Sequence, residues 1–195
     1  MITPPVHAKG TTAKEELNMR RIVKWVLGGI IGLAVIFAAG TYVLPGEAVV
    51  QRQIVIAAPP AKVWQIVGTL KRFNEFSPWA ELDPNIAYKF EGPETGAGQK
   101  MSWISKDASV GNGSITVLVS VENQRLLNEL DFGDMGKSTS SFELAPVNGG
   151  TGVTWGFKST LNNPMERWFG LFFDRWIGAD YEKGLLKLKA VAEKP

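Results

Sequence analysis

The sequence predicts an α+β domain preceded by one transmembrane helix. Three observations support this prediction. Residues 25–46 form an uncharged apolar stretch, seven runs of alternating apolar and polar residues follow, and residues 163–193 repeat apolar side chains at spacings of three and four. Because turn sequences separate the alternating runs, we expect a seven-stranded antiparallel sheet that ends in a long C-terminal helix.

The uncharged stretch is 22 residues long and lies between Lys24 and Glu47. A helix rises about 1.5 Å per residue, so about 20 residues cross a hydrocarbon core of roughly 30 Å. We therefore expect residues 14–46 to form a cytoplasmic extension and a transmembrane helix. Residues 25–46 are the part of this segment expected to lie in the membrane. The preceding residues 1–13 are expected to be a disordered tail.

Positive charge gathers before this stretch, where five Lys and Arg residues oppose two Glu. Positive residues close to a span resist translocation. We therefore expect a single-pass protein with a cytoplasmic N-terminus and a periplasmic or extracellular C-terminal domain, as in a bacterial inner membrane. A cleaved signal peptide is the alternative, since Ala38-Ala39-Gly40 offers small residues at the spacing of a cleavage site.

Residues 47–195 have the length of a single domain. Alternation over residues 49–56 predicts the first strand, and Pro59-Pro60 stops it because proline cannot donate to a strand ladder. Apolar residues at helical spacing predict a short helix over residues 61–70. A second short helical or irregular piece is expected over residues 71–79.

Six further strands are predicted after these helices, with turns rich in Gly or Asn between them. They cover residues 86–91, 100–103, 115–121, 125–132, 138–145 and 151–159.

The last helix is expected over residues 163–193, with Asn163 as its cap. Its first half is apolar on more than one face, which is wider than the stripe that a core requires. A curved sheet that contacts the helix on several sides would explain this width. The alternative is an interfacial patch of Trp168, Leu171 and Phe173 that meets the bilayer.

The composition excludes many common kinds of site. The chain has no cysteine, and its single histidine, His7, lies in the tail. Thiolate chemistry, Ser-His-Asp catalysis and the usual histidine-ligated metal sites are therefore excluded from the domain. The composition still allows an all-carboxylate site for Mg²⁺ or Ca²⁺, but no EF-hand spacing appears, and no catalytic residue, metal site or cofactor is expected. The residues after the span carry 16 basic and 17 acidic side chains, so we expect no nucleic-acid partner.

Several short segments carry a resemblance to a known family. They are residues 56–64 (IAAPPAKVW), 70–79 (LKRFNEFSPW), 91–93 (EGP) with 96–98 (GAG), and 101–103 (MSW). In these segments and in its order of elements, the sequence resembles the START-like superfamily, also called SRPBCC, and within it the bacterial polyketide cyclase/dehydrase-like subgroup. The resemblance covers about residues 49–193. It identifies a fold better than a chemistry, because members include lipid carriers, hormone receptors, cyclases and co-chaperones.

The resemblance implies a helix-grip fold, in which the sheet wraps around the C-terminal helix and a cavity lies between them. Alternation along the strands then nominates the side chains that line this cavity, together with residues of the short helices and the gripping helix. The expected ligand-binding residues are Trp79, Tyr88, Phe90, Met101, Trp103, Phe132, Phe142, Trp155, Phe157, Phe169, Phe172 and Trp176. Such a lining suits an apolar or aromatic ligand. For each of these residues, the alternative is an ordinary place in the core.

Four polar groups are also expected to reach the interior: Arg52, Asn128, Ser140 and the Tyr88 hydroxyl. These expectations favour a membrane-anchored binding module or carrier for a hydrophobic small molecule, such as a lipid or a polyketide-like aromatic molecule. The alternatives are a cyclase or dehydratase that positions a flexible substrate in the same cavity, and an interaction module whose cavity has collapsed into solid core.

Overall fold

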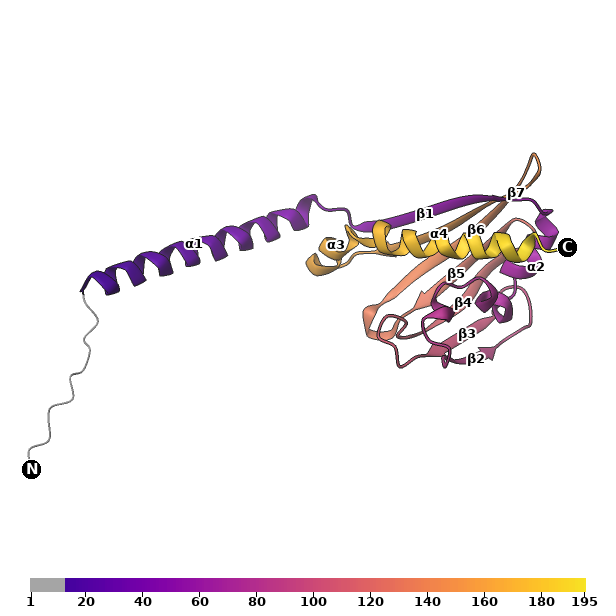
Figure 1. The fold of residues 1–195 in the computed structure, drawn as a ribbon, viewed down its shortest axis with the longest axis horizontal. Helices are drawn as coiled ribbons and strands as arrows, with labels where there is room; N and C mark the ends of the chain where they lie inside the picture. The colour runs from indigo at the N-terminus through magenta and orange to yellow at the C-terminus, as the bar shows by residue number, and fades with distance from the viewer. Residues whose placement is uncertain (1–12) are drawn as a thin grey trace, which may run out of the picture. The chain divides into compact units, whose positions relative to one another are not determined.

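The computed structural model describes residues 13–195, with side chains from residue 16 onward. The predicted disordered tail therefore lies outside the described residues, except for Ala13. The chain divides into two units, one up to Leu44 and the other Pro45–Pro195. The first contains helix α1 (Ala13–Val43), and the second contains a sheet and the remaining helices (Figure 1).

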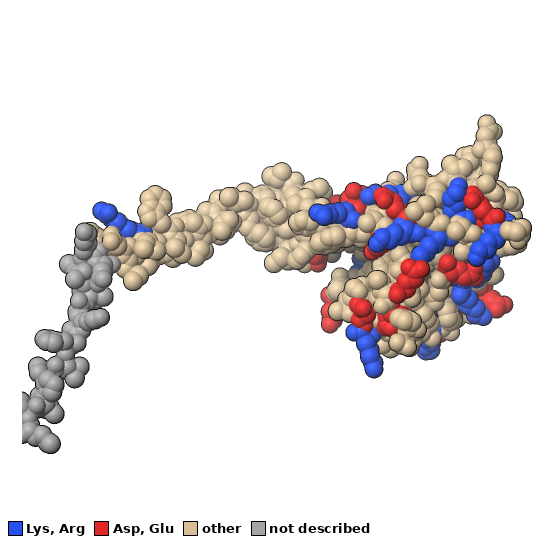
Figure 2. All heavy atoms as spheres, in the orientation of Figure 1, with Lys and Arg blue, Asp and Glu red and all other residues tan. Residues whose placement is uncertain are grey.

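Helix α1 is long and apolar enough to cross a membrane over Glu16–Val43, and its most apolar 18-residue window has a mean hydropathy of 2.2. Its charged side chains lie at its N-terminal end, and none follows Lys24 (Figure 2). This length and composition fit a spanning helix and equally fit a signal sequence.

The second unit is built on one antiparallel sheet of seven strands in the order β1-β7-β6-β5-β4-β3-β2. The strands are β1 (Glu47–Ile56), β2 (Ala87–Glu91), β3 (Lys100–Ile104), β4 (Asn112–Val121), β5 (Arg125–Asp131), β6 (Lys137–Val147) and β7 (Gly150–Thr160). From β2 to β7 each strand pairs with the next along the chain, and β7 returns to pair with β1. The predicted seven-stranded antiparallel sheet is confirmed.

The helices of the domain occupy three places in the chain. Between β1 and β2 lie α2 (Pro60–Val67), η1 (Leu70–Glu75) and η2 (Trp79–Glu81); η3 (Gly133–Met135) lies between β5 and β6; and α3 (Pro164–Gly170) and α4 (Phe173–Ala192) follow β7. In Figure 1, α4 runs along β1 and across the sheet. Its buried side chains, including Tyr181, Leu185 and Leu188, complete the core.

The helix predicted over residues 163–193 is in fact two helices. Asn163 caps the first as predicted: its side chain accepts a hydrogen bond from the Glu166 backbone, and the Glu166 side chain accepts one from the Asn163 backbone. Helix α3 then ends at Gly170, a residue that weakens helices. A Cβ atom at Gly170 would lie 2.6 Å from Cδ1 of Leu161, so this glycine allows the close approach of α3 to the end of β7.

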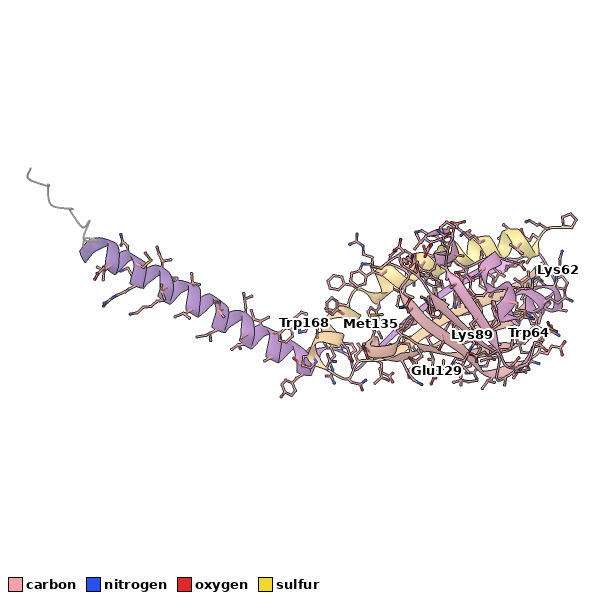
Figure 3. All side chains as sticks on the ribbon, turned by 90° about the horizontal axis from the view of Figure 1, so that it is seen from below. Lys62, Trp64, Lys89, Glu129, Met135 and Trp168 are labelled. Atoms are coloured by element: carbon pink, nitrogen blue, oxygen red, sulfur yellow. The ribbon has the colours of Figure 1, made fainter. Side chains whose placement is uncertain are left out.

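The domain has two ends, which we call the α3 end and the α2 end. Trp168 of α3 lies at the opposite end of the domain from Lys62 and Trp64 of α2 (Figure 3). The register pairs Glu47 with Thr160 and Asp131 with Lys137. The start of β1, the end of β7 and the β5–β6 connection therefore lie at the α3 end.

Candidate functional site

The inner face of the sheet carries most of the predicted ligand-binding residues. Tyr88 pairs with Trp103, Phe90 with Met101, and Phe142 with Trp155. Directly paired residues of antiparallel strands point to the same face. The predicted alternation therefore gives the correct face for these six residues.

Trp155 occupies the centre of the interior and is only 2% exposed. Its ring stacks on Tyr181 of α4 with 4.0 Å between centroids, and on Phe142 with 4.8 Å. Three further rings meet it nearly edge-on at 5.9–6.4 Å: Phe73, Phe76 and Trp79. At this level, aromatic rings fill the space between the sheet and α4.

The twelve predicted ligand-binding residues divide into three environments. Four are buried in the core: Met101, Phe142, Trp155 and Phe157. Four are half-buried: Trp79, Tyr88, Trp103 and Phe132. Four are exposed: Phe90, Phe169, Phe172 and Trp176.

The three exposed helical residues, Phe169, Phe172 and Trp176, differ from the expectation that they face the interior. The interruption between α3 and α4 changes the phase of the helical stripe, so Phe173 and Ile177 pack against the core instead. The Phe173 ring meets the Phe157 ring with 6.0 Å between centroids. Phe173 is therefore an inward residue, not a member of the predicted interfacial patch, and Trp168 is half-buried.

The half-buried aromatic residues Tyr88, Trp103 and Phe132 lie at the α3 end, and we call them the rim. The Trp103 ring meets the Phe132 ring edge-on at 6.0 Å. Gly113 lies opposite Trp103, and a Cβ atom there would come within 2.6 Å of the indole. A glycine at this position therefore makes room for the Trp103 ring.

A polar cluster lies deeper in the interior. Asn128 and Ser140 are neighbours on β5 and β6, and they are 4% and 5% exposed. The Ser140 hydroxyl oxygen accepts hydrogen bonds from Nε1 of Trp155 at 3.0 Å and from the Tyr181 hydroxyl at 3.4 Å. Oδ1 of Asn128 is buried without a hydrogen-bond partner. A buried acceptor without a partner is costly and therefore marks a place where a donor is missing.

Arg52, also predicted to reach inside, instead joins β1 to α4 at the edge of the sheet. Its guanidinium donates to Asp174 at 2.9 Å and to Glu182 at 2.6 Å. These hydrogen bonds raise the pKa of Arg52 and lower the pKa of Asp174. The positive charge of Arg52 is therefore paired with two carboxylates of α4.

The interior offers hydrogen bonds but little acid–base chemistry. Among residues 16–195, the buried polar side chains are Ser77, Gln99, Asn128, Ser140 and Thr151, none of which ionises near neutral pH. Burial raises the pKa of Tyr181 well above its ordinary value, so its phenol stays protonated. The same residues contain no group of three or more His, Asp or Glu that could hold a metal ion.

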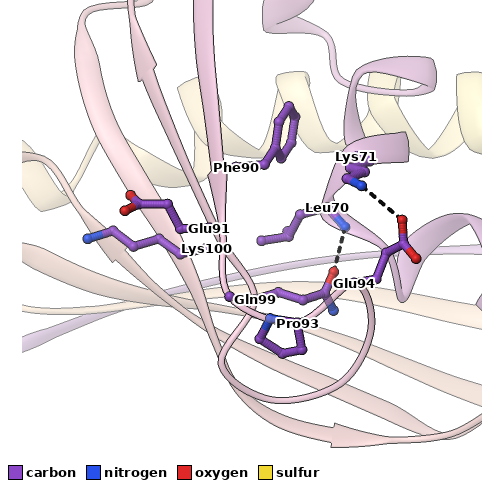
Figure 4. A pocket seen from close by; sticks show the side chains of 9 residues that line it. Leu70, Lys71, Phe90, Glu91, Pro93, Glu94, Gln99 and Lys100 are labelled. Atoms are coloured by element: carbon purple, nitrogen blue, oxygen red, sulfur yellow. Dashed lines mark hydrogen bonds and ion pairs between the residues drawn. The ribbon is translucent and has the colours of Figure 1, made fainter.

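A separate pocket of about 200 Å³ lies at the α2 end, between η1 and the β2–β3 connection (Figure 4). Its buried amide, Gln99, accepts a hydrogen bond from the Leu70 backbone and donates to the carbonyl groups of Gly68 and Gly96. Nothing in the sequence pattern indicated this role for Gln99. The Gln99 amide is therefore bonded within the protein, and the volume is below the roughly 300–1,000 Å³ of typical ligand sites.

Comparison with known proteins identifies a matching family and solved structures with a similar fold. Residues 47–193 match the family described as "Polyketide cyclase / dehydrase and lipid transport". No curated protein matches the sequence.

Among solved structures, protein CV1439 from Chromobacterium violaceum is 18% identical with a TM-score of 0.52, covering 76% of this chain and 99% of that chain. Ara h 8.0201 is 13% identical with a TM-score of 0.55, covering 75% and 98%. The di-domain ARO/CYC StfQ of the steffimycin biosynthetic pathway is 13% identical with a TM-score of 0.58, covering 96% and 62%. At such identities, these likenesses establish the fold alone.

Proposed function

Because this chain belongs to the polyketide cyclase/dehydrase and lipid transport family, we propose that it binds a hydrophobic small molecule and presents it at a membrane. The observation that carries this proposal is the chemistry of the interior. Aromatic rings lie against the buried hydrogen-bonding groups of Ser140 and Tyr181, with the buried amide of Asn128 beside Ser140, and no buried carboxylate, lysine or histidine accompanies them among residues 16–195. Such an interior suits binding better than proton transfer.

The proposed ligand is largely apolar and carries a hydrogen-bond donor, such as a hydroxyl group, and it would enter when the stacked rings around Trp155 move apart. Ser140 already accepts from Trp155 and Tyr181, whereas Oδ1 of Asn128 is unpartnered. A ligand hydroxyl at Asn128 would satisfy this acceptor. The rim is the proposed route of entry, because its rings are half-buried while those around Trp155 are tightly stacked.

The proposed membrane attachment rests on α1. Glu16–Val43 is long and apolar enough to span, and Arg20, Arg21 and Lys24 lie in its N-terminal part. By the positive-inside rule, the N-terminus would be cytoplasmic and the domain periplasmic or extracellular. Anchoring would hold the domain beside the phase in which an apolar ligand dissolves.

A cyclase or dehydratase is the second candidate. The family description supports it, and so does Tyr181, whose buried phenol remains a hydrogen-bond donor at neutral pH. In such an enzyme, the Tyr181–Ser140 pair would orient a substrate carbonyl, and catalysis would come from positioning. Conversion of a bound polyketide-like substrate, instead of its unchanged release, would favour this candidate.

Native mass spectrometry of the full chain in mild detergent, followed by extraction and identification of bound molecules, tests the proposal. We expect one defined hydroxylated apolar molecule to remain bound, and the intact mass to include α1. The control is Leu130→Trp, which adds a ring at a half-buried inward position near the rim and leaves α1 unchanged. Equal retention by both proteins would indicate lipid bound around α1 and would contradict the proposal. A mature mass without α1 would instead identify a cleaved signal peptide.

A further inference from the structure

Five large apolar side chains are exposed where α3 meets α4, and we call them the junction patch: Met165, Phe169, Leu171, Phe172 and Trp176. Each is about half exposed, with values from 48% to 56%. The rings of Phe172 and Trp176 stack on each other with 5.3 Å between centroids. Soluble surfaces rarely gather aromatic side chains in this way without a binding role.

The junction patch is not needed to build the core. Phe173 and Ile177 supply the contacts of this segment with the interior, and Phe173 packs on Phe157. The capping box of Asn163 and Glu166 fixes the start of α3 independently of the patch. The apolar side chains of the junction patch are therefore available to contact another surface.

The patch lies close to the point where the chain enters the domain. The Gly46 carbonyl accepts a hydrogen bond from the Leu161 backbone at 2.8 Å, and Gly170 lies against the Leu161 side chain. Helix α1 ends at Val43 and β1 begins at Glu47, so only residues 44–46 connect them. Three extended residues span about 10 Å.

We propose that the junction patch inserts into the interfacial layer of the same bilayer that α1 spans. This inference rests on the proposed anchoring by α1, and it adds a second contact of the domain with the membrane, made by the junction patch. A connection of about 10 Å keeps the α3 end within reach of the membrane surface. Phe, Trp, Leu and Met are the side chains that interfacial surfaces bury at the boundary of headgroups and acyl chains.

This docking would also bring the rim to the membrane. Tyr88, Trp103 and Phe132 lie at the same end of the domain as α3. An apolar ligand would then pass between the bilayer and the interior with little exposure to water.

The absence of cysteine from the chain makes a clean test possible. Phe172→Cys in the full chain, labelled with a fluorophore and reconstituted in phosphatidylcholine–phosphatidylglycerol nanodiscs, reports contact with nitroxide-bearing lipids. The matched control is Leu186→Cys, which is 61% exposed on α4 and about 20 Å along that helix from Phe172, its N-cap residue. We expect several-fold stronger quenching at position 172 than at position 186, and Leu171→Cys to behave like Phe172→Cys.

Weak and equal quenching at positions 172 and 186, in protein that resists carbonate extraction from the bilayer, would overturn the docking and leave the anchoring intact. Release by carbonate would overturn the anchoring and the docking together. Close label-to-label contact at position 172 without lipid quenching would overturn the proposal in favour of a second copy of the chain. Unchanged thermal unfolding of the labelled proteins is the control for folding.

Discussion

The ring of Tyr181 lies almost flat on the ring of Trp155, with 4.0 Å between their centroids and 14° between their planes. This stack joins the middle of α4 to the middle of the sheet. The Tyr181 hydroxyl donates to Oγ of Ser140 at 3.4 Å, a long hydrogen bond. The aromatic contact should therefore hold α4 in place more strongly than the hydrogen bond does.

Replacement of Tyr181 separates these two contributions. We expect Tyr181→Ala to lower the free energy of unfolding by about 3–5 kcal/mol, as for other large aromatic side chains removed from a core. Tyr181→Phe keeps the stack and should cost about 1 kcal/mol or less. Urea unfolding followed by tryptophan fluorescence measures both. Similar losses in the two variants would show that the hydroxyl, and not the ring, holds α4.

The buried phenol also predicts a loss of stability at alkaline pH. Burial raises the pKa of Tyr181 above its ordinary value of 10.0. The unfolded chain therefore releases this proton first, so the stabilisation is complete below about pH 10 and is lost as the pH rises further. The slope from this group is at most about 1.4 kcal/mol per pH unit.

Tyr181→Phe is the matched control for this pH dependence, since it keeps the ring and removes the ionisation. Chemical unfolding of both proteins from about pH 9 to about pH 12 should show a steeper decline for the unsubstituted chain. Parallel curves would mean that Tyr181 ionises as readily in the folded protein as in the unfolded one.

The order of the domain's elements could be predicted from the sequence because strand periodicity is local. Ile115 and Val117 alternate with polar residues, and both are buried as the period of two requires. The same reasoning placed Asn128 and Ser140 inside. A change of helical phase is harder to predict, because it depends on the tertiary contact between Gly170 and Leu161.

The close stacking of aromatic rings at the centre of the domain could not be predicted from the sequence pattern either. Alternation shows that Trp155 and Phe142 face inward, but it cannot tell whether opposing rings close on each other or leave space. That outcome depends on how near α4 approaches the sheet. At Gly184 the absence of a side chain allows α4 to approach the sheet closely, because a Cβ atom there would lie 2.5 Å from Cζ3 of Trp155.

We therefore expect replacement by alanine to change the free energy of unfolding differently at Gly184 and at Gly178. In Gly184→Ala, the new methyl group meets a buried ring held between Phe142 and Tyr181, so we expect a loss of about 1–3 kcal/mol in the free energy of unfolding.

In Gly178→Ala, the nearest atoms belong to the end of the Arg52 side chain, which can move at the expense of exposed ion pairs. The helical preference of alanine over glycine offsets part of that cost, so we expect a change within about 1 kcal/mol. Thermal and urea unfolding of the two variants give the comparison. A Gly184→Ala protein as stable as the original would show that α4 can shift away from Trp155.

The two buried amides of the domain, Asn128 and Gln99, should respond in opposite ways to apolar replacement. Gln99 satisfies the Leu70 backbone amide and two backbone carbonyl groups, so Gln99→Met leaves buried groups unpaired and should cost about 2 kcal/mol or more. Oδ1 of Asn128 has no partner, so Asn128→Leu removes an unsatisfied acceptor and should leave stability unchanged or higher.

Asn128→Leu should nevertheless weaken the binding of a hydroxylated ligand by about tenfold, which corresponds to about 1.4 kcal/mol. Binding of the matching ligand without the hydroxyl group should be unaffected, and titration with both ligands makes the comparison internal. A large loss of stability in Asn128→Leu would show that this amide serves the fold as Gln99 does. Since a structural amide and a ligand-binding amide differ in these two measurements, the pair of variants distinguishes a solid core from an interior prepared for a ligand.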